Sequence, residues 1–398
     1  MQIKEKLDDY DIIILGAGMA GLSLVYRGIK SGVWASKKIL IIEKELKTRN
    51  DKTFCFWSVE NNPHLKDFEP IIKYRWNQMQ IFENSGEQIN LKTTKKRSND
   101  KSDYHYNLIH SLDFYETILG FLKTCNNIDI KYQIVETVDS GIVTLSDGEY
   151  YSASQIFDTR NIPIPSESEV QNKRYQYFLQ HFKGVKLEII DHGFDLDSIH
   201  LMDFRTSQEF GTAFFYLLPF NKNEIFVEYT LFNKELLIDC EYDKQIEIYL
   251  KEVLNLNKQD YKILDTEFGV IPMTNYQYER HSGHGVNKVF NLGTRGGDTR
   301  GSTGYTFYNT QRTITEILAN YKTNKPFQEP VSSLSRYFDS IFLRVLNQGN
   351  YKGSQMFADI FKNAPLDSVL AFLDGEANIK QTFQIINSVK KLPFIKAL

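Results

Sequence analysis

The sequence of 398 residues has few of the features that mark secreted, metal-binding or membrane-spanning proteins. Its three cysteines, Cys55, Cys125 and Cys240, are widely separated and form no CxxC or Cys/His spacing. This scarcity argues against a disulfide framework and a metal site, and it favours a reducing compartment. No apolar run approaches the ~20 residues of a membrane-spanning helix, and the polar start MQIKEKLDDYD resembles neither a secretory nor a transit signal. We therefore expect a cytoplasmic protein whose membrane contact, where it has any, is peripheral.

The sequence also lacks an excess of either charge, because 47 Lys and Arg stand against 50 Asp and Glu, for a formal net charge of −3. The sequence thus gives no reason to expect nucleic acid as a partner. Aromatic residues are abundant instead, with 28 Phe and 23 Tyr against 10 Pro. They either fill an ordinary core or line a large apolar pocket, and composition does not separate these two uses.

The N-terminal segment carries a dinucleotide-binding fingerprint. A predicted buried strand over 12–15 precedes Gly16-x-Gly18-x-x-Gly21, and a helix of apolar spacing follows. Gly16 permits the tight turn, Gly18 lets the backbone approach a pyrophosphate, and Gly21 lets helix and strand pack closely. Glu43 ends the next predicted strand about 20 residues later, where an acid accepts hydrogen bonds from ribose hydroxyls. The pattern predicts dinucleotide binding but does not by itself separate FAD from NAD.

A late glycine-rich segment, KVFNLGTRGGDTRGSTGYTFYNTQRTITEIL, favours FAD. It predicts a strand over 289–292, a glycine loop and a helix that starts near Ser302. An exposed helix N-terminus offers free backbone amides and the positive end of the helix dipole, and in FAD enzymes such an element lies by the flavin ring or its phosphate arm. The alternative is a glycine-rich surface loop. The cofactor-binding residues predicted here are Gly293, Gly296, Gly297, Ser302, Thr303 and Gly304.

Two charged residues follow another short predicted strand, which closes with Ile156 and Phe157. Asp158 and Arg160 either anchor a loop against the cofactor or form a plain surface ion pair.

The order of these segments predicts an α/β protein with an FAD-binding fold of the Rossmann type, as in glutathione reductase and the aromatic hydroxylases. Strand patterns between its parts predict an inserted antiparallel sheet that faces the substrate, and the C-terminal region reads as amphipathic helices. The charged run 92–103 is expected to be a solvated loop. The expected boundaries are 1–60, 100–160 and 285–325 for the FAD-binding domain, 61–99 and 161–284 for the substrate subdomain, and 326–398 for the helical region.

Glu228 stands among phenylalanines in the predicted strand FVEYTLF. Side chains alternate along a strand, so Phe226, Glu228, Thr230 and Phe232 share one face. Either an edge strand presents its polar face to water, or the carboxyl group is desolvated so that it holds a proton near neutral pH.

Several short segments, in a fixed order, resemble one family. They are NDKTFCFW, YQYFLQHFKG, LMDF, FFYLLPF, FVEYT, EFGVIPM and STGYTF. Together they resemble the lycopene β-cyclases, FAD-dependent carotenoid enzymes of bacteria and plants, over about residues 10–312. FVEYT stands where plant members have FLEET, so the second acid of the family's pair is Tyr229 here. Alternation sends residue 229 to the opposite face, and its loss therefore need not harm Glu228.

The resemblance implies redox-neutral closure of the ends of lycopene into the rings of γ- and β-carotene. Glu228 would be the acid and base, and negatively charged reduced FAD would stabilise the cation, with NAD(P)H as an indirect reductant. Asp203 is a further candidate, and Glu267 is a second acid/base, a flavin-side group or a structural cap. Aromatic faces add cation–π attraction to such a pocket. The expected substrate-pocket residues are Trp57, Phe214, Tyr216, Phe226 and Tyr305.

Three alternatives stay open on the same sequence. An FAD monooxygenase or halogenase would need NAD(P)H and oxygen, although the Gly-Asp pair usual in oxygenases is Gly293-Thr294 here. A prenyl-chain reductase would consume electrons, and a carrier of carotenoid or flavin would have no turnover. Because lycopene dissolves in membranes, we also expect membrane-surface contact, with the C-terminal VKKLPFIKAL as its candidate segment. The sequence does not indicate an oligomeric state.

Overall fold

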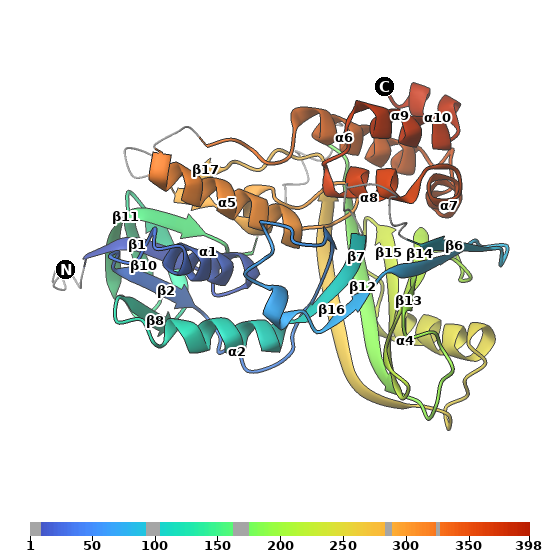
Figure 1. Ribbon diagram of the computed structural model, residues 1–398, viewed down its shortest axis with the longest axis horizontal. Helices are drawn as coiled ribbons and strands as arrows, with labels where there is room; N and C mark the ends of the chain where they lie inside the picture. The colour runs from blue at the N-terminus through green and yellow to red at the C-terminus, as the bar shows by residue number, and fades with distance from the viewer. Residues whose placement is uncertain (1–8, 93–103, 162–174, 283–288, 324–326) are drawn as a thin grey trace.

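The computed structural model describes residues 9–92, 104–161, 175–282, 289–323 and 327–398. Figure 1 shows a first sheet with its helices on the N-terminal side, a second sheet beside it, and the C-terminal helices over one end of the second sheet. The expected loop at 92–103 lies outside the described residues except for Lys92, the last residue of a strand.

The first sheet is parallel at its centre because its strands are runs of Ile and Leu that are buried on both faces. Its order is β17-β18-β11-β1-β2-β8, with the antiparallel strands β9 and β10 added beside β11. The glycine fingerprint therefore follows a central strand, as predicted. The bounds are β1 (Asp9–Leu15), β2 (Ile39–Glu43), β8 (Ile128–Tyr132), β9 (Val135–Asp139), β10 (Ile142–Leu145), β11 (Tyr150–Asp158), β17 (His281–Ser282) and β18 (Val289–Asn291).

Helices cover one face of this sheet. Ile12 and Ile14 of β1 pack into a core with α1 (Met19–Lys30), α2 (Ser111–Leu122) and α5 (Phe307–Thr323), and the alternate residues of β1 pack against β10 and β11. Strand alternation thus separates the two cores.

The second sheet has the order β16-β12-β15-β14-β13-β5-β6. Its pairs are antiparallel, as predicted, except for β13 and β5, which are parallel. One face packs on α4 (Asp239–Ile248), and the other lies toward the C-terminal helices. The bounds are β5 (Gln78–Phe82), β6 (Gln88–Lys92), β12 (Tyr177–Glu188), β13 (Ser198–Asp203), β14 (Thr212–Asn221), β15 (Glu224–Asn233) and β16 (Lys262–Thr274).

A small third sheet has the order β3-β7-β4. It crosses the expected boundary near residue 60, because β4 belongs to the segment assigned to the substrate subdomain and β3 and β7 do not. The division into subdomains stays a proposal. The bounds are β3 (Thr53–Val59), β4 (Tyr74–Trp76) and β7 (Tyr104–His110).

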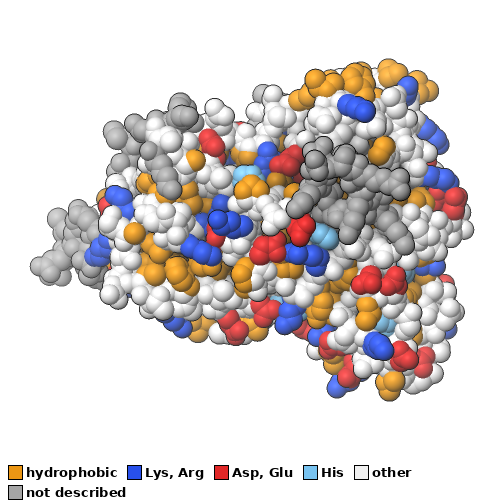
Figure 2. Space-filling model, in the orientation of Figure 1, with side chains coloured by type: hydrophobic (Ala, Val, Ile, Leu, Met, Phe, Trp, Pro, Cys, Tyr) orange, Lys and Arg blue, Asp and Glu red, His pale blue; other side chains and the backbone are white. Residues whose placement is uncertain are grey.

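The C-terminal region is helical, as predicted, and its last two helices present an apolar face to the surface. Figure 2 shows hydrophobic side chains gathered over this end of the molecule, with basic side chains beside them. Phe383, Leu392, Ile395 and Leu398 are more than half exposed, and no acidic residue occurs in 379–398. The bounds are α6 (Ser333–Gln348), α7 (Gly353–Asn363), α8 (Leu366–Asp374), α9 (Ile379–Ser388) and α10 (Lys391–Lys396).

No helix of the described residues is both long enough and apolar enough to cross a membrane.

Candidate functional site

The glycine fingerprint forms an open cradle at the end of β1. Gly16 has φ +101°, a value that favours glycine, and a methyl group built on Gly21 would lie 2.1 Å from the carbonyl oxygen of Gly16. A methyl group built on Gly18 would meet no atom within 4 Å. The backbone conformation at Gly16 and the close backbone contact at Gly21 therefore require glycine, whereas Gly18 faces free space.

Glu43 lies buried beside this cradle. Its carboxylate accepts hydrogen bonds from the backbone N–H groups of Ala17, at 2.7 Å, and Lys44, at 2.9 Å. Lys47 forms an ion pair with it at 3.4 Å. These contacts fix the carboxylate at the edge of a large cavity.

That cavity, of about 610 Å³, runs along the ends of β1, β2 and β11. Gly16, Gly18 and Glu43 line it, together with Arg160 and Arg295. Both arginines pair with the buried Asp158, at 2.8 Å for Arg160 and 3.1 Å for Arg295. Asp158 therefore positions two cations along a cavity whose size and charge fit a nucleotide with a pyrophosphate.

The late glycine loop lies beside the start of α1. A methyl group built on Gly293 would lie 2.9 Å from Cβ of Ala20, and one built on Gly296 would lie 2.2 Å from the carbonyl oxygen of Asn291. These glycines are needed for close packing of the loop, whereas Gly297, with φ +81°, closes a short 3₁₀ turn.

The predicted helix start at Ser302 was wrong. The helix α5 begins at Phe307, and the backbone of Gly304 has φ +73°, which a right-handed helix cannot contain. The Ser302 hydroxyl donates to Asp339 of α6 at 2.7 Å instead of capping the helix. Of the three expected cap residues, Thr303 and Gly304 line the central cavity described below and Ser302 does not.

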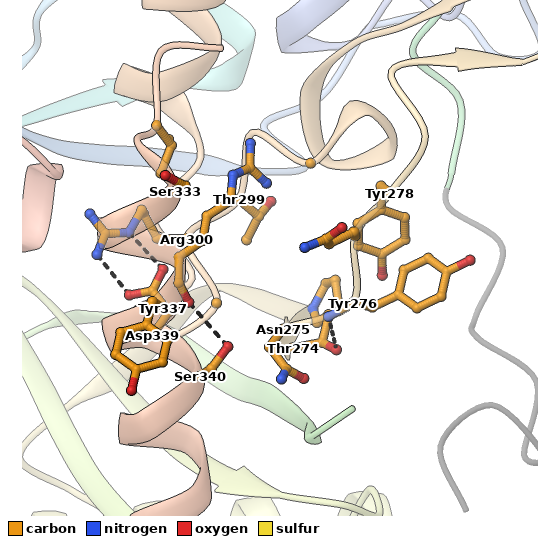
Figure 3. A pocket seen from close by; sticks show the side chains of 16 residues that line it. Thr274, Asn275, Tyr276, Tyr278, Thr299, Arg300, Ser333, Tyr337, Asp339 and Ser340 are labelled. Carbon is orange, nitrogen blue, oxygen red and sulfur yellow. Dashed lines mark hydrogen bonds and ion pairs between the residues drawn. The ribbon is translucent and has the colours of Figure 1, made fainter. Parts of the chain in front are cut away.

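Ser302 instead belongs to a second network through Asp339, whose ion pair with Arg300 is shown in Figure 3. Arg300 is 1% exposed and donates to both carboxylate oxygens of Asp339, at 3.0 and 2.7 Å. The pair lines a separate polar pocket together with Gly297 and residues of the 274–278 segment. This network joins the late glycine loop to the C-terminal helices.

The central cavity lies between the two sheets and has a volume of about 290 Å³. Met19, Thr294 and Thr303 contribute from the fingerprint helix and the late loop, and Phe54 and Tyr106 contribute from the small third sheet. The second sheet forms another wall with Gln180, Phe182, Tyr216, Leu218, Phe226, Glu228, Glu267, Gly269, Val270 and Ile271.

Glu228 faces this cavity from β15, on the strand face that alternation predicted. Its carboxyl group accepts one hydrogen bond, from the Thr230 hydroxyl at 2.7 Å. Burial, with a smaller contribution from the charge of Glu267, raises the pKa of Glu228 to about 8. With this pKa the protonated form of the carboxyl group prevails at neutral pH. β15 pairs with β12 on one side and with β14 on the other, so the alternative of an edge strand is wrong.

Glu267 lies in the same cross-strand row. Gly184 of β12 pairs with Glu228 on one side and with Glu267 of β16 on the other. The Cα atoms of the two glutamates are thus about 10 Å apart, two strand spacings, with Gly184 between them in the row.

Two phenylalanine rings pack against glycines in the same wall. A methyl group built on Gly184 would lie 2.2 Å from Cζ of Phe226, and one built on Gly269 would lie 2.2 Å from Cζ of Phe182. The rings of Phe226 and Phe182 therefore reach across neighbouring strands and cover backbone that would otherwise face the cavity.

The expected substrate-pocket residues divide into two groups. Tyr216, Phe226 and Tyr305 line the central cavity. Trp57 and Phe214 are fully buried behind it, where the Trp57 indole N–H donates to the Tyr305 hydroxyl at 3.3 Å. Trp57 and Phe214 thus support the wall rather than form it.

Asp203 is not brought to Glu228. It pairs with Phe215 of β14, so it faces α4 on the other side of the sheet, where Arg205 and Tyr249 donate to its carboxylate. Tyr229 lies on that face too, with its ring 5.0 Å from that of Phe215, as alternation predicted. We therefore do not propose a catalytic role for Asp203.

Sequence reasoning missed three contributions to the site. Thr53 donates its backbone N–H and its hydroxyl to Glu267, at 3.0 and 2.5 Å. Cys55 lines the cavity, and burial raises the pKa of its thiol, which keeps it uncharged. The buried Oε1 atom of Gln180 has no hydrogen-bond partner among the described residues. All three lie in segments that carry the family resemblance, Thr53 and Cys55 in NDKTFCFW and Gln180 in YQYFLQHFKG, but nothing in the sequence shows that they face one cavity.

Comparisons with known proteins agree with this geometry. Residues 11–398 match the family described as Lycopene cyclase protein. A chloroplastic neoxanthin synthase of Solanum tuberosum is 24% identical over 284 residues, which is 66% of this chain and 52% of that protein. The chain therefore spans about half the length of the curated relatives that it matches.

Solved structures share the fold at low identity. A flavoprotein/dehydrogenase from Cytophaga hutchinsonii superposes with a TM-score of 0.63 at 12% identity, and a geranylgeranyl bacteriochlorophyll reductase-like protein from Thermoplasma acidophilum with 0.59 at 10%. Each comparison covers 98% of both chains. The Rossmann-type fold predicted from the sequence is confirmed.

Proposed function

Because the chain belongs to the lycopene cyclase family, we propose that it closes the linear ends of lycopene into β-ionone rings without net transfer of electrons. The observation that carries this proposal is Glu228, an acid that holds its proton to about pH 8 inside a cavity lined by aromatic rings. A protonated carboxyl group in an apolar cavity suits protonation of an alkene, because water there would capture the cation.

The residues present fit FAD as the cofactor. The cradle of Gly16 and Gly18, with Glu43 and the two arginines on Asp158, suits the adenosine and pyrophosphate. The orphaned Oε1 of Gln180 and the loop of Thr303 and Gly304 suit the polar edge of a flavin ring at the central cavity. Bound reduced FAD supplies negative charge near a developing carbocation.

The side chains of the central cavity supply the proton and exclude water. Glu228 gives its proton to the terminal double bond. Tyr216 and Phe226 exclude water and present ring faces to the cation, each worth about 0.5–2 kcal/mol as cation–π contacts. Since no electrons are consumed, we propose NAD(P)H only as the indirect source of electrons that keep the flavin reduced.

The test is the carotenoid extracted from lycopene-producing cells that express the chain. A product of unchanged mass with a blue-shifted absorption spectrum supports cyclisation. A product heavier by hydrogen or oxygen supports a reductase or an oxygenase instead. Untouched lycopene beside soluble, flavin-loaded protein contradicts the proposal and leaves the carrier alternative.

Substitutions at two glycines of the fingerprint should affect different properties, FAD affinity at Gly18 and stability at Gly21. We expect Gly18→Ala to keep the wild-type melting temperature and to weaken FAD binding about 10-fold or more, because its methyl group enters the anion cradle. Gly21→Ala should lower stability by about 1–3 kcal/mol through its clash with the backbone. Gly120→Ala, at an open position near the C-terminal end of α2, is the matched control. Flavin fluorescence titration and thermal unfolding check both; equal FAD affinity in Gly18→Ala and wild type would contradict the cradle.

We further propose that the apolar end formed by α9 and α10 docks on an anionic membrane surface. Leu392 and Ile395 are 63% and 62% exposed, and residues 379–398 hold four lysines and no Asp or Glu, a charge that complements negative headgroups. This contact would bring a membrane-dissolved substrate to the protein.

The docking proposal predicts that Leu392→Asp with Ile395→Asp abolishes co-sedimentation with phosphatidylcholine vesicles that contain phosphatidylglycerol. Ile190→Asp, at a position 91% exposed on another part of the surface, should sediment like wild type. Equal sedimentation of all three proteins contradicts the assignment.

A further inference from the structure

The central cavity shares a wall with a second, smaller cavity of about 190 Å³. Thr53, Phe226 and Glu267 line both cavities. The ring of Phe226 and the Thr53–Glu267 pair therefore stand between the site of Glu228 and the second cavity.

The second cavity is polar and reaches the surface. Its other titratable groups are His110, Asp113, Lys186 and Asp265, and Asp265 is exposed. Burial lowers the pKa of His110, so its ring is neutral at neutral pH. A proton that arrives at Glu267 thus has acceptors and solvent on its far side.

The two glutamates are held in different ways. Thr53 directs one donor at each oxygen of Glu267, and hydrogen bonds of this kind favour the charged form. Burial is the largest effect and, with the charge of Asp51, raises the pKa of Glu267 overall, whereas the Thr53 hydrogen bonds and the charge of Lys52 limit that rise. Glu228 receives a single donor and is the protonated member of the pair. Environments that differ in this way assign acid and base roles to two carboxyl groups.

We propose that Glu267 is the base that removes the ring proton and releases it to solvent through the second cavity, with Thr53 as its positioning residue. This inference rests on the proposed cyclisation. Glu228 protonates the terminal double bond, and the next double bond supplies the electron pair of the new C–C bond. A C–H bond beside the resulting cation then breaks. Its electron pair forms the ring double bond, its proton goes to Glu267, and solvent reprotonates Glu228.

The position of the base selects the ring isomer. Protons on three different carbons beside the cation are acidic, and loss of each one gives a different ring. Only one isomer has its ring double bond conjugated with the polyene. Because Thr53 holds both oxygens of the Glu267 carboxylate, loss of its hydroxyl should lower both the rate and the selectivity.

Thr53→Val tests the positioning role with purified, flavin-reduced protein and lycopene. We expect kcat to fall about 10-fold or more with KM little changed, and rings with an unconjugated double bond to appear as products of shorter absorption wavelength. Loss of a donor raises the pKa of the base, so the acidic limb of the pH–rate profile should move up by about one unit. Thr53→Ser should restore rate, product and profile, and Thr137→Val, exposed on β9, is the control.

A labelled substrate tests the separate base. Lycopene is labelled with deuterium only at the one carbon of each end that loses its proton to give the conjugated ring. A separate base should then yield rings free of label. A single glutamate acting as both acid and base would return part of the label to the product. Label retained in the product would overturn the inference but not the proposed function. The same holds if the Thr53→Val and Glu267→Gln proteins keep the wild-type rate and product. Absence of cyclised product from the wild type would overturn the proposed function, and the inference with it.

Discussion

Glu228→Gln is expected to lower the rate of cyclisation by at least about 100-fold, because the amide cannot supply the proton that starts the reaction. The flavin should remain bound, since Glu228 contacts neither the glycine cradle nor Glu43. Glu188→Gln, the same change at an exposed position of β12, is the matched control and should keep the wild-type rate. Initial rates of lycopene loss, followed by chromatography with absorption detection, measure the difference.

The same group sets the upper limit of the pH range. An acid catalyst works only while it is protonated, so the wild-type rate should fall as the pH rises through about 8. A Glu228→Gln protein within about threefold of the wild-type rate, or a wild-type rate that is flat well above this pH, would contradict the role of Glu228.

Asp339→Ala is expected to cost about 3–5 kcal/mol of stability, because it leaves the buried guanidinium of Arg300 without its carboxylate partner. Arg336→Ala removes a half-exposed ion pair with Glu329 in the same region and should cost less than about 1 kcal/mol. Urea unfolding followed by tryptophan fluorescence compares the two variants.

A loss of similar size in both variants would contradict this account of the Arg300–Asp339 pair. The expected difference follows from burial: Arg300 is 1% exposed, whereas the side chains of Arg336 and Glu329 are 32% and 39% exposed.

Local rules predicted the parts of the site that depend on a single strand or turn. The fingerprint glycines, Glu43 at the end of β2 and the cavity-facing side of Glu228 all follow from short-range geometry. The opposite side of Tyr229 follows from the same alternation.

Pairings between distant segments could not be predicted. Asp203 was expected near Glu228, but the face that it occupies depends on the register of β13 against β14, which shifts between His200 and Asp203. Thr53 and Glu267 are 214 residues apart and belong to different sheets, and no local pattern joins them. Ser302 was expected at the start of a helix, where serine is a common capping residue. Its hydroxyl instead donates to Asp339 of α6, and the sequence around Ser302 does not indicate which distant residue it meets.

The two rings that lie on glycine make the cavity easier to widen than to narrow. Shortening Phe182 or Phe226 would leave the strands in place and give a longer or bulkier end group more room. Any side chain added at Gly184 or Gly269 would collide with the ring packed on that glycine, so the ring would have to move. Variation that changes substrate range in this protein should therefore begin at the phenylalanines, and new residues at the glycines should be tolerated only after the ring opposite has already become smaller.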